Sequence, residues 1–209
     1  MNFIRTISII IIFLTASCSR TFILPDSPQI AHNHKVIAII PPSVPVKANR
    51  KLDAAALKQQ QETESLNFQN VIYSCLLKRK MKSDILIDIQ PVETTNAKLK
   101  KAGYPDTPLT VDEMCETLGV DGIITSTIGY SKSIPDVVAA LMIVLSGGAS
   151  AMTPTSEAHI SVSINDCANK KLIWNFDDKC VGMLGSSPTR LAALLIKRAA
   201  KRTPYNISR

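Results

Sequence analysis

Aromatic residues and catalytic motifs are both scarce in this sequence. Aromatic side chains make up 5% of the 209 residues, so a core has to rely on Ile, Leu, Val and Ala. There is no G-x-S-x-G elbow, and Gly147-Gly148 lacks the Gly-Lys-Ser/Thr of a phosphate-binding loop. Of only three histidines, His32 and His34 form an H-x-H pair that lacks the neighbouring Cys or acidic ligands of a good metal site. We therefore predict no catalytic residue, no metal and no cofactor, and a protein that is not an enzyme.

The acidic residues support the same prediction. Asp112, Glu113 and Glu116 fall at an expected helix start, where negative charge favours the helix dipole. Asp177 and Asp178 are adjacent in an expected strand and therefore point in opposite directions. Neither group predicts a pair of carboxyls for acid and base catalysis.

No apolar run is long enough to cross a bilayer, which takes about 20 residues. The run from Ile7 to Leu14, broken by Ser8, follows the basic Arg5 and has the length of a secretory signal. Leu14, three small residues and Cys18 then match a bacterial lipobox. This pattern predicts a signal peptide over 1–17 and acylation of Cys18, for example with palmitate. The alternative is an ordinary secreted protein with a cysteine there by chance.

Residues 18–34 contain two prolines and no hydrophobic period, so we expect an extended, lipidated tether. Ser19 is not the acidic residue that holds enteric lipoproteins at the inner membrane, which favours the periplasmic face of the outer membrane. The chain carries 24 basic and 17 acidic residues. For an exported protein we attribute this excess to anionic lipid headgroups or solubility rather than to nucleic acid.

The remainder predicts one α/β domain over 35–205. Apolar runs at 35–40, 85–89 and 120–130 alternate with helical patterns, which is typical of parallel strands with right-handed crossovers. Alternating residues at 158–164 and 172–176 predict an antiparallel hairpin. Helices are expected over 52–81, 93–102, 110–118 and 187–203. The expected architecture is a three-layer-like sandwich with a mixed sheet of about five strands and flanking helices.

An insert at 134–152 interrupts this order. It contains nine consecutive apolar residues, 137–145, too few to cross a bilayer. The run is consistent with a core-packed helix, a membrane-dipping insert or an oligomer contact. The candidate contact residues are Val137, Val138, Leu141, Met142, Val144 and Leu145.

The remaining cysteines have separate expected roles. Cys75 and Cys115 lie on the apolar faces of expected helices and are interpreted as small core residues. Cys167 and Cys180 flank the hairpin and are the one pair that we consider for a disulfide. Residue 180 lies beyond the far end of the second strand, so simple pairing geometry disfavours that bond.

Several segments together resemble a known group. They are the lipobox, KVIAIIPP at 35–42, PVETTNAKLKKAGY at 91–104, EMCETLGVDGIITSTIGY at 113–130 and KKLIWNF at 170–176. Together they look like the CsgG-like and TolB N-terminal-like periplasmic lipoproteins, most specifically at the helix-to-strand junction 118–124. The resemblance covers most of 35–205 and implies an α/β sandwich used for protein contacts at the outer membrane. Pore formation is not carried over, because the insert is short and does not alternate.

Two functions are therefore expected in order. The first is a non-enzymatic, lipid-anchored binding or scaffold protein that acts through protein contacts or self-assembly as a homo-oligomer. The alternative is a lipid-handling envelope protein that uses the apolar run 137–145 to shield an acyl chain.

Overall fold

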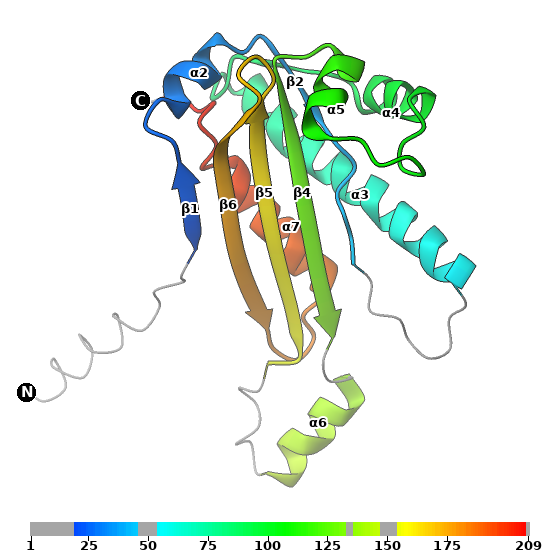
Figure 1. The fold of residues 1–209 in the computed structure, drawn as a ribbon. Helices are drawn as coiled ribbons and strands as arrows, with labels where there is room; N and C mark the ends of the chain where they lie inside the picture. Colours follow the sequence, from blue (N-terminus) through cyan, green and yellow to red (C-terminus); the bar gives the residue numbers. More distant parts are fainter. Residues whose placement is uncertain (1–18, 46–53, 133–135, 147–153, 208–209) are drawn as a thin grey trace, which may run out of the picture.

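The computed structural model describes residues 19–45, 54–132, 136–146 and 154–207. Within them, six strands form one mixed sheet in the order β1-β6-β5-β4-β2-β3 (Figure 1). The strands are β1 (Arg20–Ile23), β2 (Val36–Ile39), β3 (Asp88–Ile89), β4 (Gly122–Lys132), β5 (Ser156–Asp166) and β6 (Lys171–Gly182). The helices are α2 (Ser27–Asn33), α3 (Ala54–Met81), α4 (Val92–Lys101), α5 (Val111–Leu118), α6 (Asp136–Leu145) and α7 (Pro188–Ala200). The expected mixed α/β sheet with flanking helices is confirmed, with one strand more than the five predicted.

Strand β2 explains the continuous apolar run near the start of the domain. It pairs in parallel with both β3 and β4. Ile37 and Ile39 face the core that the sheet shares with α3 and α7, whereas Ala38 packs with α4 and α5 on the other face. Successive side chains of a strand point to opposite faces, so a strand covered on both faces is apolar at every position.

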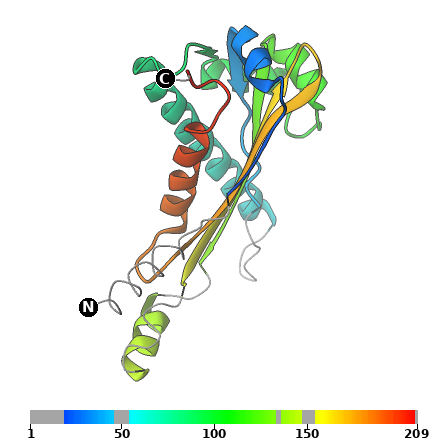
Figure 2. The same ribbon diagram turned by 90° about the vertical axis from the view of Figure 1, so that its left-hand side faces the viewer.

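The antiparallel half of the sheet is covered on one face. Strands β4, β5 and β6 pair in antiparallel register. The alternating pattern predicts the β5–β6 hairpin, whereas the antiparallel pairing of β4 with β5 was not predicted. The alternate β5 residues from Ala158 to Ile164 are buried, while those from His159 to Ser163 are partly exposed. Helices α3 and α7 lie on the same side of the sheet, as Figure 2 shows, and α7 packs on both β5 and β6. The fully buried Trp174 and Phe176 of β6 stack in this core.

Helix α5 begins and ends at the residues that the sequence indicates. The Thr110 hydroxyl accepts a hydrogen bond from the Glu113 amide at 3.3 Å, and a Glu113 carboxylate oxygen accepts one from the Thr110 amide at 2.7 Å. This reciprocal pair satisfies two of the amides that a helix start leaves free. Gly119 then ends the helix with φ of 63°, a conformation that favours glycine.

The segment predicted as a tether is folded from Arg20 onward, so that prediction is wrong over 20–33. Strand β1 pairs antiparallel with β6, with Arg20 opposite Asp177 and Ile23 opposite Trp174. Helix α2 follows and begins with a proline in its first two positions, where the missing amide costs no helical hydrogen bond. The prolines therefore mark a helix start rather than extended chain, and β1 covers an otherwise unpaired sheet edge.

One disulfide forms among the described cysteines, and its pairing differs from the one considered above. Cys115 of α5 and Cys167, in the turn after β5, are joined with a Cα–Cα distance of 5.6 Å, while Cys75 and Cys180 are free. The backbone amide of Cys167 donates to the Asp121 carbonyl oxygen, which places this turn against the end of α5. Cys180 pairs with Ala158, far along the hairpin from Cys167. Cys115 comes shortly before β4 and Cys167 directly follows β5, so the pairing of β4 with β5 brings the two bonded cysteines together.

Candidate functional site

Helix α6 is exposed although nearly every residue in it is apolar. Its sequence, DVVAALMIVL, has one charged residue, at the start. The exposed fractions are 42% for Val138, 57% for Leu141, 45% for Met142, 76% for Val144 and 77% for Leu145. The helix lies beyond the ends of β4 and β5 (Figure 1). The core-packed alternative for this run is therefore wrong at the five contact candidates whose side chains are described; the Val137 side chain lies outside the described residues.

Three further apolar side chains are exposed at the same end of the sheet. The register places Lys132, Ser156 and Gly182 side by side, where β4 ends, β5 begins and β6 ends. Val181 precedes this point, and Met183 and Leu184 follow it, with exposed fractions of 53%, 48% and 41%. We call these three residues and the five exposed α6 residues the α6 end. The β6 contribution was missed from the sequence, although an apolar run directly after a strand was a signal for it.

The length of α6 limits what this surface can do. Ten residues make a helix about 15 Å long, against about 30 Å for the hydrocarbon core of a bilayer. Among the described residues, no helix combines the length and the apolar character that a membrane crossing requires. An apolar helix of this kind is stabilised when an apolar environment covers it. The α6 end is therefore suited to a contact rather than to a span.

A cluster of polar side chains, which we call the His34 cluster, is buried at the end of the sheet opposite the α6 end. The Nε2 atom of His34 lies 2.7 Å from Oδ1 of Asp166, and its Nδ1 lies 2.9 Å from the Tyr205 hydroxyl. The other oxygen of Asp166 accepts hydrogen bonds from the backbone and side-chain amides of Asn169, each at 2.7 Å. The cluster joins the chain after α2, the turn after β5 and the C-terminal segment.

The surroundings of this cluster shift two pKa values. Burial by itself raises the pKa of Asp166, but the hydrogen bonds from His34 and Asn169 outweigh it, so the net pKa lies below its usual value. Burial raises the pKa of Tyr205, and the nearby Asp166 and Asp121 carboxylates raise it further. Asp166 is thus held as a carboxylate and Tyr205 as a neutral hydroxyl.

The His34 cluster ties segments together rather than presenting a reactive group. Its histidine and aspartate side chains are each 3% exposed, and both ring nitrogens have partners. A Cβ atom at Gly122 would lie 2.8 Å from the His34 ring, so the ring packs directly against the β4 backbone. His32 of the H-x-H pair is exposed instead. Among the described residues, no group of three His, Cys, Asp or Glu side chains is placed to hold a metal ion.

The two adjacent aspartates of β6 point to opposite faces, as predicted. Asp177 lies 3.0 Å from Nε2 of His159 on the partly exposed face. Asp178, which is 2% exposed, lies 3.3 Å from an Arg198 nitrogen of α7 on the other face. The two aspartates contact different neighbours and do not form an acid–base pair.

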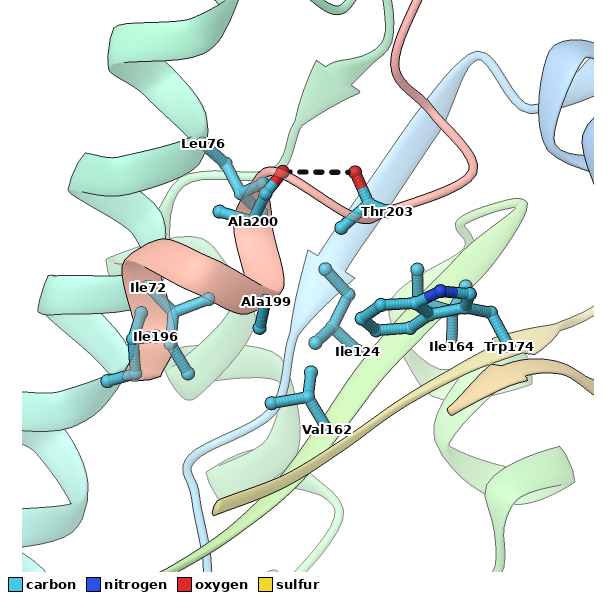
Figure 3. A pocket seen from close by; sticks show the side chains of 10 residues that line it. All are labelled: Ile72, Leu76, Ile124, Val162, Ile164, Trp174, Ile196, Ala199, Ala200 and Thr203. Atoms are coloured by element: carbon cyan, nitrogen blue, oxygen red, sulfur yellow. Dashed lines mark hydrogen bonds between the residues drawn. The ribbon is translucent and has the colours of Figure 1, made fainter. Parts of the chain in front are cut away.

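A small cavity lies between the sheet and helices α3 and α7 (Figure 3). Its volume is about 20 Å³, and its lining includes Ile72, Val162, Trp174 and Ile196. The Thr203 hydroxyl on its wall donates to the Ala200 carbonyl oxygen. Such a volume holds about one water molecule, so this cavity has no room for an acyl chain.

The fold and the site together define an α/β sandwich with an exposed apolar helix at one end of its sheet. No family model matches the sequence, and no match was found among curated proteins. Comparison with solved structures does find similar chains. A PelC dodecamer from Paraburkholderia phytofirmans is 10% identical with a TM-score of 0.49, over 92% of this chain and 99% of that one.

Two further solved structures are similar. Lipoprotein GNA1162 from Neisseria meningitidis is 12% identical with a TM-score of 0.44, over 80% of this chain and 96% of that one. The LpoB C-terminal domain from Salmonella enterica is 9% identical with a TM-score of 0.32, over 70% and 82%. Bacterial lipoproteins are thus among the similar structures, but at these values the likeness carries no residue role to this chain. The specific resemblance to CsgG-like and TolB N-terminal-like proteins stays a prediction.

Proposed function

We propose that this chain is a non-enzymatic lipoprotein of the bacterial envelope that acts by binding, with the α6 end as its contact surface. Cys18 carries the lipid and holds the domain at the periplasmic face of the outer membrane. The observation that carries the proposal is the exposure of α6. Exposed apolar side chains gathered on one helix are a mark of interaction sites in proteins that are otherwise stable in water.

The anchor and the contact surface support each other. The lipobox pattern ends at Cys18, and stable anchoring by lipid takes two or more acyl chains. A protein confined to a membrane surface meets other envelope components at a raised effective concentration. Contacts at the α6 end, with a second copy or with another envelope component, then need little intrinsic affinity.

The test is in vivo crosslinking of the lipidated chain, followed by mass spectrometry of the crosslinked species. Leu141→Asp places a charge on α6, and Leu86→Asp is the matched control, because Leu86 is 68% exposed and lies beside β3 near the opposite end of the sheet. We expect Leu141→Asp to abolish the crosslinks while Leu86→Asp keeps them, with unfolding midpoints in urea equal to that of the parent. Equal crosslinking by both variants would exclude the α6 end as the contact surface.

Cys18→Ala tests the anchor separately. We expect this variant to leave the membrane fraction and to lose function in the cell. Full function of the released protein would show that anchoring only determines location.

A further inference from the structure

The folded N-terminal segment leaves almost no free chain between Cys18 and the domain. A tether over 18–34 would let the domain point in any direction on the membrane. In the structure β1 begins at Arg20, so Ser19 alone separates the lipidated cysteine from the sheet. The Ser19 hydroxyl also accepts a hydrogen bond from Arg202, just after α7. The lipid is therefore attached at a defined place on the fold.

The strand register tells where that place is. Arg20 lies opposite Asp177, five residues before Gly182 at the end of β6, or about 17 Å at the usual rise of a strand. Because β1 is antiparallel to β6, it runs away from the α6 end, and its first residue, Arg20, is the β1 residue nearest to that end. The two residues back to Cys18 reach at most about 7 Å. This reach covers at most about 7 of the roughly 17 Å, so at least about 10 Å remain between the lipidated residue and the level where the strands end.

The opposite end of the sheet is less accessible to the lipid. Lys171, where β6 begins, lies six residues from Asp177 in the other direction, or about 20 Å. Strand β1 runs toward that end, which α2 covers (Figure 1). An anchor at Cys18 therefore brings the bilayer to the α6 end.

The chemistry of α6 fits the interior of that bilayer. No charged residue occurs from 137 to 145, and a charge in the hydrocarbon region is costly. The helix, about 15 Å long, matches the thickness of one monolayer, about half of the 30 Å hydrocarbon core. Figure 2 shows α6 beyond the sheet, on the side toward which β4 runs.

We propose that α6 inserts into the same monolayer as the acyl chains on Cys18. The domain is then held at two points, and its sheet stands with the α6 end on the membrane. The partly exposed face of β5 and β6 is left facing the periplasm. This inference rests on the proposed function, specifically on lipidation of Cys18.

The experiment measures contact between α6 and acyl chains by fluorescence quenching. The full lipidated chain with Leu141→Trp is reconstituted into phosphatidylcholine vesicles whose acyl chains carry bromine. Val144→Trp gives a second reading on α6, and Leu86→Trp is the control at the opposite end. The parent contains one tryptophan, Trp174, which is fully buried in the core and supplies the background. Mass spectrometry verifies the lipid on Cys18 in every sample.

We expect a blue shift and a loss of emission for both α6 variants, and unchanged emission for Leu86→Trp and the parent. Quenching of the α6 variants no stronger than that of Leu86→Trp would overturn the proposal. A blue shift without quenching would mean that protein covers α6, which overturns membrane insertion and leaves the binding function standing. Absence of lipid on Cys18 would overturn the proposed anchor itself.

Discussion

The Cys115–Cys167 disulfide allows a quantitative prediction. The two cysteines are 52 residues apart in sequence, and the bond restricts the unfolded chain by closing a loop of that length. The loop-closure entropy for about 50 residues corresponds to roughly 4 kcal/mol at room temperature. Domains of this kind unfold at a cost of about 5–15 kcal/mol, so the double variant Cys115→Ala/Cys167→Ala should lose a large part of its stability.

The assay is equilibrium unfolding in urea, followed by the fluorescence of Trp174, which is fully buried in the folded state. With a denaturant slope of about 2 kcal/mol/M, a loss of 4 kcal/mol lowers the unfolding midpoint by about 2 M. Reducing agent should lower the parent midpoint to that of the variant and leave the variant unchanged. The control is Cys75→Ala/Cys180→Ala, which removes the two free thiols. An unchanged midpoint in the disulfide variant would refute the entropic argument.

Two further predictions concern the buried cluster. His34→Ala leaves the Asp166 carboxylate buried without its imidazole partner, and breaking such a pair lowers the free energy of unfolding by about 3 kcal/mol. Hydrogen exchange should then show α2 opening first. The control, His32→Ala at an exposed position, should leave both the free energy of unfolding and the exchange of α2 unchanged. The folded-state pKa of Asp166 is lowered, so its stabilisation is complete above about pH 4, the usual aspartate range, and is lost as the pH falls through the folded-state pKa. Urea midpoints between pH 6 and pH 2 should therefore fall more steeply for the parent than for Asp166→Asn, and parallel curves would contradict this assignment.

Much of the local structure could be predicted from the sequence because it depends on neighbouring residues. The pair of Thr110 and Glu113 marks the start of α5, since capping involves residues three apart. The alternation from Ala158 to Ile164 predicts a strand with one buried face, which the structure confirms. The apolar run 137–145 predicts α6 as a contact candidate, and the structure shows that its described side chains are largely exposed.

What only the tertiary structure decided depends on residues far apart in the chain. His34 meets Asp166 and Tyr205 across 132 and 171 positions, and Cys115 meets Cys167 only through the register of β4 with β5. Strand β1 was missed because the edge of β6 that it covers becomes available only when the sheet has formed. Periodicity and capping act within one element, whereas pairing between elements is determined by how the whole sheet is assembled. Residues 20–33 consequently belong to the folded domain instead of forming a free linker, and Ser19 alone separates Cys18 from β1.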